Sequence, residues 1–234
     1  MIATKSNMYK DAKTQNYFVG CRFDCVYCKP SFQAQMKRQK HNCMDCYRYK
    51  PHEHPERLGK IPNSKIVFVC GDGDISFSTP EYTNKIIETI KKKSKPNQTV
   101  YFQSKNPAYF SNFDFPSNVV LLTTLETDDD EIYRGISKAP TVSVRAEAFR
   151  QLEHPRKGIT IEPIIKFNTD RFVSIIKGIK PEFVWIGYNS RPKQVQLPEP
   201  LLLRTKELIA ELEKFTEVRR KTIRMAWYGE GIGG

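Results

Sequence analysis

The chain has 234 residues and a mass of 27.2 kDa, and its 38 Lys and Arg against 26 Asp and Glu give a net charge of +12. Its mean hydropathy is −0.56 and it has no apolar run near the roughly 20 residues that span a bilayer, which excludes a membrane protein, a collagen and a disulfide-rich secreted scaffold. We expect a cytoplasmic protein with one domain over residues 1–234, because the amino terminus shows no secretory signal. The positive charge predicts an anionic partner such as nucleic acid, unless it belongs only to a solvated, lysine-rich surface.

The predicted elements alternate between strands and helices. The first is a short strand over residues 16–19, and a basic stretch rich in Cys and His follows at 29–60. Short, continuous apolar runs are typical of parallel strands that are buried on both faces. Such runs lie at 65–70, 99–103, 119–124, 159–165 and 183–186, and helices are predicted at 79–93, 144–152, 172–179 and 199–215.

Five of the six cysteines fall between Cys21 and Cys46. The first three, Cys21, Cys25 and Cys28, form a C-x3-C-x2-C run, and thiolates at such short spacing can converge on one metal group. Three thiolates can hold three irons of a [4Fe–4S] cluster, which leaves the fourth iron open for another ligand.

The segment from Gly20 to Cys28 resembles the cluster loop of radical S-adenosylmethionine (radical SAM) enzymes. The resemblance implies an α/β fold, a partial (β/α)6 TIM-like barrel with a metal-binding loop inserted after the first strand. It also implies a [4Fe–4S] cluster, SAM bound to the open iron, cleavage of SAM to a 5′-deoxyadenosyl radical, and an electron donor such as flavodoxin or ferredoxin. In that family the aromatic residue before the last cysteine, here Tyr27, lies near the adenine. Zinc ligation by the three cysteines is the alternative.

In parallel α/β folds the site lies at the carboxyl ends of the strands. Gly71, Asp72, Gly73 and Asp74 follow the second predicted strand. They stand where radical SAM enzymes carry a Gly-Gly-Glu-like stretch that holds the methionyl amino group of SAM. The resemblance leaves open which of the two carboxylates makes this contact, and a turn with solvated aspartates is the alternative.

The next two strands also end in polar residues. By the same resemblance, Lys105 pairs with the methionyl carboxylate of SAM, and Ser104 or Thr124 contacts the ribose hydroxyls. Glu126 is expected either at the ribose or as a buried polar group. The alternative for Lys105 is a lysine that faces water.

Cys70 ends the second predicted strand, on the side where the substrate is expected. Its S–H bond is weak enough to give a hydrogen atom to a substrate radical. The placement resembles the spore photoproduct lyase family of DNA-repair radical SAM enzymes, whose hydrogen-donor cysteine also follows the cluster motif. A cysteine packed in the core is the alternative.

A second group of metal-ligand residues lies between the first two predicted strands. Cys43 and Cys46 with His52 and His54 match the donor set of a tetrahedral zinc site. His41 is the alternative ligand to one of these two histidines. An auxiliary iron–sulfur cluster and a polar loop with two free thiols are the alternatives.

The basic residues are not evenly spread. Lys91–Lys95 close a predicted helix, where cations stabilise the macrodipole, so we assign them a local role. The loop at 29–60 combines cations with Phe32, Tyr47 and Tyr49, a mixture that can hold phosphates and stack bases.

The sequence also resembles an uncharacterised group of radical SAM proteins from phages, bacteria and archaea, through the segments 143–145 (Ser-Val-Arg) and 161–163 (Ile-Glu-Pro). We expect a radical SAM enzyme of lyase or transferase type that modifies or repairs a nucleic acid or nucleotide. A small metabolite is the second substrate class and a peptide the third. From another class, the chain would be a non-catalytic, zinc-dependent nucleic-acid-binding module.

Overall fold

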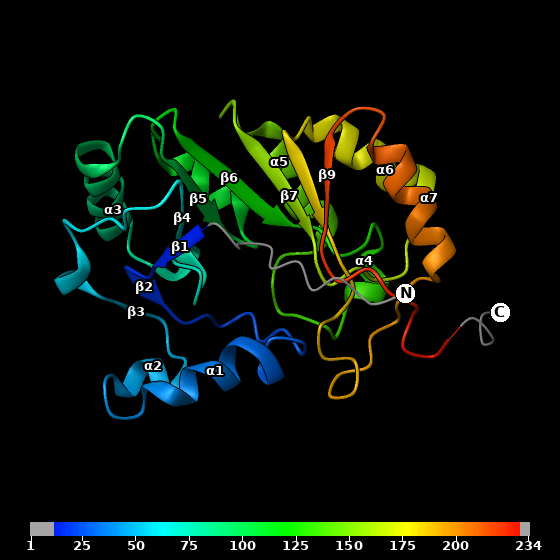
Figure 1. Cartoon of the computed structure of the whole chain (residues 1–234), viewed down its shortest axis with the longest axis horizontal. Coiled ribbons are helices and arrows are strands. Elements are labelled where there is room, and N and C mark those ends of the chain that lie inside the picture. Colours follow the sequence, from blue (N-terminus) through cyan, green and yellow to red (C-terminus); the bar gives the residue numbers. More distant parts are fainter. Residues whose placement is uncertain (1–11, 230–234) are drawn as a thin grey trace.

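The computed structural model describes residues 12–229. Seven parallel strands form one curled, half-barrel sheet in the order β1-β4-β5-β6-β7-β8-β9 (Figure 1). Every neighbouring pair of strands is parallel, so all the carboxyl ends of the strands lie at the same edge of the sheet. Their bounds are β1 Ala12–Gln15, β4 Ile66–Val69, β5 Thr99–Gln103, β6 Val119–Thr124, β7 Lys157–Ile161, β8 Phe183–Ile186 and β9 Glu217–Arg220.

Four helices cover the outer face of the sheet (Figure 1). Thr79 caps the first of them by accepting a hydrogen bond from the backbone N–H of Tyr82 at 3.3 Å, and a proline at the first turn favours the start of the helix. The helices bury apolar side chains such as Ile86, Phe149 and Phe172 against alternate residues of the strands. The helices are α3 Pro80–Lys93, α5 Val142–Gln151, α6 Thr169–Ile179 and α7 Leu202–Leu212.

The other set of alternate strand residues faces the inside of the half-barrel. A small apolar cluster that includes Phe68, Leu122 and Phe183 fills part of this inner space. Gly158 makes room for this cluster, because a Cβ at that position would lie 2.6 Å from the Leu122 side chain. Towards the carboxyl ends of the strands the inner face becomes polar, and the candidate site lies there.

A long excursion leaves the sheet after β1 and returns before β4. Its two ends pair with each other, because β2 (Phe18–Val19) and β3 (His52–Glu53) form a separate antiparallel ladder. The basic stretch predicted as an insertion lies within this excursion (Figure 1). It contains a π-helix at Lys29–Gln33, α1 at Ala34–Met36, a 3-10 turn at Lys37–Gln39 and α2 at Met44–Arg48.

Short elements complete the carboxyl-terminal side of the sheet. They are 3-10 turns at Pro55–Arg57, Ile75–Phe77 and Pro107–Asn112, and the single-turn helix α4 at Asp130–Tyr133. Among the described residues, no helix is long and apolar enough to cross a membrane. Most of the amino-terminal segment that shows no secretory signal lies outside the described residues.

The structure corrects the strand prediction at both edges. The first strand of the sheet is β1, and residues 16–19, which were expected to form it, contribute the β2 strand of the separate ladder instead. The sheet also gains β9, so it has seven strands where six were expected. Both missed strands are polar, reading AKTQ and EVRR, because an edge strand is not buried on both faces.

Candidate functional site

A cavity of about 410 Å³ opens at the carboxyl edge of the sheet, where the site was predicted. Cys21, Cys25 and Cys28 line it together with Cys70. Six more of the predicted site residues line the same cavity, namely Tyr27, Gly71, Gly73, Asp74, Lys105 and Thr124. The fold thus gathers in one place residues that are far apart in the sequence.

Two glycines allow the cluster loop to cross the turn after β4. Gly20 has a φ of +94°, and a Cβ on it would lie 2.2 Å from the carbonyl oxygen of Lys50. A Cβ on Gly73 would lie 2.8 Å from the backbone nitrogen of Gly20. Backbone hydrogen bonds from Gly20 to the Asp72 carbonyl and from Asp74 to the Gly20 carbonyl, both 3.1 Å, fix the crossing. Only residues without a Cβ permit this approach.

Each of the three loop thiols has a polar neighbour. The backbone N–H of Phe23 donates to Cys21 Sγ at 3.4 Å, and the Ser137 hydroxyl lies 3.1 Å from Cys25 Sγ. The Tyr49 hydroxyl lies 4.0 Å from Cys28 Sγ. Burial raises the pKa of the Cys21 and Cys28 thiols, which disfavours the thiolate form when no metal is bound. Three thiols in one cavity, with hydrogen-bond donors beside them, are suited to holding an iron–sulfur cluster.

A charged network centred on the fully buried Glu126 and Arg145 lies behind Tyr27. The Glu126 carboxylate accepts hydrogen bonds from the Tyr27 hydroxyl at 2.6 Å and the Arg145 guanidinium at 2.8 Å, and it pairs with Lys105. Burial alone would raise the pKa of Glu126, but Arg145 and Lys105 lower it to about 2. Arg145 also lies over the Tyr133 ring, 4.6 Å from its centroid. Tyr27 and Lys105 are therefore held in place from the side away from the cavity.

The two candidate aspartates have different surroundings. Asp74 lines the cavity, and its Oδ1 accepts from Ser76 and from the Ser104 hydroxyl at 2.7 Å, while its Oδ2 accepts from the Lys105 backbone N–H at 2.8 Å. Asp72 pairs with the Asn16 side chain at 2.6 Å, and burial raises its pKa. Asp72, Ser104 and Glu126 support the wall of the cavity and are not among the residues that line it.

Cys70 is buried and has a φ of +56°, which is uncommon for a residue with a Cβ. Burial raises the pKa of its thiol to about 12, with the backbone N–H groups of Phe18 and Tyr17 lowering it in part. The side chain therefore keeps its S–H bond at neutral pH. It also belongs to the main apolar core, so both interpretations of Cys70 agree with its position.

The second predicted metal site is assembled in the structure. The ligand atoms of Cys43, Cys46, His52 and His54 all lie within 4.8 Å of one another, and we call these residues the Cys2His2 group. His52 Nε2 lies 3.3 Å from Cys43 Sγ and 3.4 Å from Cys46 Sγ, and His54 Nε2 lies 3.3 Å from Cys46 Sγ. His41, the proposed substitute, is exposed and is not a member.

The other nitrogens of both histidines have acceptors. His52 Nδ1 lies 2.7 Å from the Lys50 carbonyl oxygen, and His54 Nδ1 lies 2.7 Å from a Glu56 carboxylate oxygen. Such partners fix the ring orientation and leave Nε2 free to bind a metal. Burial also lowers the pKa of His54, which favours the neutral imidazole that a metal requires. The four residues can hold one metal ion.

Several residues that line the cavity, or that contact its lining residues, are absent from the site residues predicted from the sequence. Glu162 and Lys221 form an ion pair in the wall formed by β7 and β9, and burial raises the pKa of Glu162. Tyr49 and Ser137 contact the loop thiols, and Arg145 holds Glu126. The segments containing Arg145 and Glu162 were noted as landmarks, but nothing in the sequence indicated the roles of Tyr49, Ser137 and Lys221.

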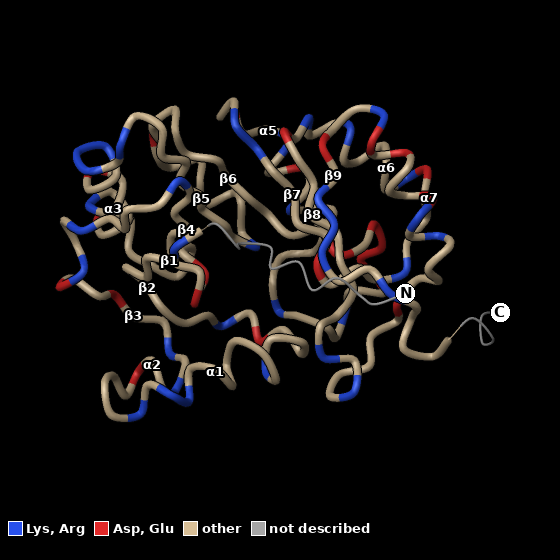
Figure 2. The backbone as a smooth tube through the Cα atoms, viewed as in Figure 1, with Lys and Arg blue, Asp and Glu red and all other residues tan. Residues whose placement is uncertain are grey.

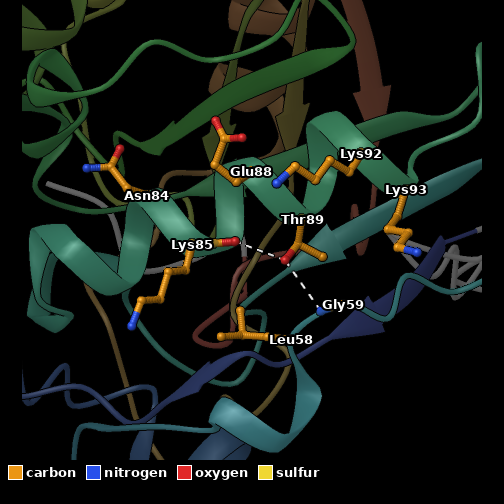
Figure 3. A pocket seen from close by; sticks show the side chains of 8 residues that line it. All are labelled: Leu58, Gly59, Asn84, Lys85, Glu88, Thr89, Lys92 and Lys93. Atoms are coloured by element: carbon orange, nitrogen blue, oxygen red, sulfur yellow. Dashed lines mark hydrogen bonds between the residues drawn. The ribbon is translucent and has the colours of Figure 1, made fainter.

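A second hollow, of about 430 Å³, lies along α3 (Figure 3), and it shares no lining residue with the first cavity. It is lined by Lys85, Lys92 and Lys93 with Glu88, and by Leu58 and Gly59 of the loop before β4. Its lining contains no thiol, imidazole or buried ion pair. It lacks the groups that the chemistry of the first cavity needs.

Two solved structures share this architecture. One is a mutant of spore photoproduct lyase with bound AdoMet and a dinucleoside spore photoproduct, with a TM-score of 0.58 and 11% identity, covering 88% of this chain and 75% of that chain. The other is a radical SAM methyltransferase from Sphaerobacter thermophilus, with a TM-score of 0.58 and 13% identity, covering 92% and 67%. The fold is that of radical SAM enzymes.

The radical SAM fold confirms the predicted fold class, an α/β partial TIM-like barrel. No family model matches the sequence, and neither does any curated protein. The likeness therefore lies in the architecture. Within its own half-barrel, this chain places the thiols of the C-x3-C-x2-C run in the cavity.

Proposed function

We propose that this chain is a radical SAM enzyme in which Cys21, Cys25 and Cys28 hold a [4Fe–4S] cluster. The observation that carries the proposal is the convergence of these three thiols on the main cavity of a radical SAM half-barrel. When bound, the cluster and SAM supply a 5′-deoxyadenosyl radical that abstracts hydrogen from the substrate. The protein holds the cofactors, orients them and excludes water.

The cavity residues have suitable chemistry for SAM. Asp74 Oδ2 has one backbone donor and retains capacity to accept from the methionyl ammonium, whereas Asp72 does not line the cavity. Lys105 is the cation for the methionyl carboxylate, and the carboxylate of SAM would share it with Glu126. Tyr27 offers its ring to the adenine and Thr124 its hydroxyl to the ribose.

Cys70 is proposed as a hydrogen-atom donor. Two observations support this role: burial raises the pKa of the thiol, which preserves the S–H bond, and Cys70 is one of the residues that line the cavity. In the step the S–H bond breaks homolytically, a C–H bond forms on the substrate and the unpaired electron stays on Sγ. Replacing Cys70 with Ala should change the product distribution while iron content stays normal; an unchanged distribution would leave Cys70 a core residue.

For the substrate we propose a nucleic acid or nucleotide. The net charge of +12 favours an anionic substrate, and one of the structural neighbours binds a dinucleoside. A cavity of about 410 Å³ has room for small groups and not for a duplex, so a base would enter it singly. The reaction would be of lyase or transferase type.

For the Cys2His2 group we propose zinc. A tetrahedral zinc ion with bonds of about 2.3 Å to sulfur and about 2.0 Å to nitrogen separates the two ligand types by about 3.5 Å. The three sulfur–nitrogen distances of 3.3, 3.4 and 3.3 Å match this spacing. Four protein ligands close the coordination sphere, as in structural zinc sites.

Anaerobic purification and metal analysis test the proposal. We expect about four irons and one zinc per chain, and formation of 5′-deoxyadenosine when dithionite or flavodoxin supplies electrons. Cys25→Ser should lose the iron and keep the zinc.

A colourless protein with zinc alone and without SAM cleavage would contradict the proposed function and indicate the non-catalytic binding module. If neither DNA nor RNA changes the yield, a small metabolite becomes the substrate class.

A further inference from the structure

The segment 29–50, which we call the first rim, concentrates positive charge beside the cavity. It contains six Lys and Arg against one Asp, a net charge of +5 of the +12 of the chain. Ser31, Phe32 and Gln35 of this segment line the cavity, so the charge lies next to the opening. Figure 2 shows Lys and Arg in the part of the excursion that carries α1 and α2; α1 itself contains none, and Arg48 lies in α2.

Most of this charge is not neutralised within the protein. Lys29 pairs with Asp24 at 3.2 Å, but Lys37, Arg38, Lys40, Arg48 and Lys50 form no ion pair within residues 12–229. All five are exposed. The helices are too short for a substantial macrodipole, since α1 has three residues and α2 five, so that local explanation does not apply here.

A second basic segment lies at the far end of the sheet. Asn189 and Ser190 line the cavity after β8, and Arg191 and Lys193 follow them directly. Both cations are exposed and form no ion pair with a described carboxylate. We call residues 191–193 the second rim. Cavity-lining residues at 31–35 and at 189–190 are thus each followed in the chain by exposed cations that form no ion pair among the described residues.

Phe32 adds an aromatic group at the opening. Its side chain lines the cavity although 46% of the residue is exposed. An exposed aromatic ring between cations and a cavity offers a nucleobase a stacking surface. If the partner were an acidic protein, it would pair with the cations and would not require an aromatic ring beside them.

We propose that the two rims bind the phosphates of a single nucleic-acid strand, with Phe32 stacking on the base that enters the cavity. The inference rests on the proposed function only for what happens inside the cavity. Binding of the strand itself needs neither SAM nor a reducing agent. The two ideas can therefore fail separately.

The hollow along α3 provides a matched control. Lys85, Lys92 and Lys93 are three exposed lysines without a carboxylate partner among the described residues. They line the hollow along α3 (Figure 3) and are not among the residues that line the cavity. They equal Arg38, Lys40 and Arg48 of the first rim in charge and number. Net charge is therefore the same in the two triple variants.

The experiment measures fluorescence anisotropy of a labelled single strand of about 12 nucleotides, as DNA and as RNA, over a range of salt concentrations. R38Q/K40Q/R48Q should weaken binding about tenfold near 0.1 M salt and lower the slope of log K against log salt by about 2. R191Q/K193Q should lower the slope by about 1. F32A should weaken binding about tenfold at an unchanged slope, because stacking releases no counterions. K85Q/K92Q/K93Q should stay within about twofold of the wild type.

Metal content and a thermal melt of each variant show that it is folded. Equal losses in the rim and control variants would overturn the proposal, because they would show attraction by net charge alone. Normal strand binding by R38Q/K40Q/R48Q, with loss of reduction by flavodoxin, would also overturn it and make the first rim a docking site for the acidic electron donor.

Discussion

The two cysteine groups of this protein are neighbours in the sequence and differ in kind. In the Cys2His2 group four ligands surround one point, and the outer nitrogens of both histidines are fixed by Lys50 and Glu56. In the C-x3-C-x2-C loop three thiols face a cavity of about 410 Å³. A closed set of four ligands suits a structural ion, whereas three ligands beside a cavity leave a coordination position for chemistry.

The comparison shows that cysteine spacing alone does not distinguish the two sites. Both contain a C-x2-C step, and what differs is the source of the remaining ligands. β3 brings His52 and His54 to the closed site, while a buried network and a glycine crossing support the open one. Three substitutions test this difference, beginning with the closed site.

Cys46→Ser should have the largest effect on stability. It removes one of four ligands from a buried position, so we expect loss of the zinc and a fall of more than about 4 kcal/mol in the free energy of unfolding. His41→Ala is the control, since His41 is exposed and outside the group. Zinc analysis and denaturant unfolding measure both. Retention of zinc by Cys46→Ser would contradict the closed site.

Glu126→Gln tests the support of the open site. The substitution leaves Lys105 and Arg145 buried without a carboxylate, at a cost of about 4 kcal/mol. Because the pKa of Glu126 is lowered to about 2 in the folded state, its ionised form stabilises the protein above about pH 4.5. That contribution, about 3 kcal/mol, is lost as the pH falls towards 2.

Unfolding of wild type and Glu126→Gln at several pH values measures this contribution. The difference between the two proteins should shrink as the pH falls from 4.5 to 2. Glu147→Gln removes an exposed carboxylate that pairs with Arg150, and it should change little at any pH. A difference between wild type and Glu126→Gln that is independent of pH would contradict the assignment.

Gly20→Ala should have the smallest effect of the three, yet it tests the link between the two sites. The new Cβ would meet the Lys50 carbonyl at 2.2 Å, and backbone cannot move aside as a flexible side chain does. We expect a loss of about 3 kcal/mol and reduced iron content. Gly135→Ala, with a φ of +83° and open space around it, should lose about 1 kcal/mol and keep its iron. Equal losses would show that positive φ alone is responsible.

The sequence was sufficient for the buried part of the fold. β4, β5, β6, β7 and β8 were predicted because strands covered on both faces read as apolar runs such as IVFV and VVLLTT. β1 and β9 were missed because edge strands keep polar residues. An apolar pattern in the sequence indicates only that a strand is buried. β1 and β9 are held in the sheet by backbone hydrogen bonds to β4 and β8, which leave no such pattern.

The candidate site was predictable where chemistry follows local spacing or strand ends. The loop cysteines, the Cys2His2 ligands and Lys105 were predicted in this way. The structure places the loop cysteines and Lys105 at one cavity and gathers the four Cys2His2 residues at one point. Tyr49, Ser137 and Lys221 were not, because each reaches the site from a segment whose approach depends on tertiary packing. Ser137 lies 112 residues from the thiol it contacts, and no local pattern encodes such a pairing.

The ladder of β2 and β3 has a consequence for assembly. All five cysteines of the two groups lie between these two short strands, while His52 lies in β3 and His54 follows it. One clamp of four residues therefore closes the part of the excursion that carries the thiols. Zinc bound to the Cys2His2 group would close this clamp independently of an iron–sulfur cluster, because its four ligands do not line the cavity. We therefore expect the protein stripped of iron to keep its loop beside the half-barrel and to take up iron and sulfide without refolding.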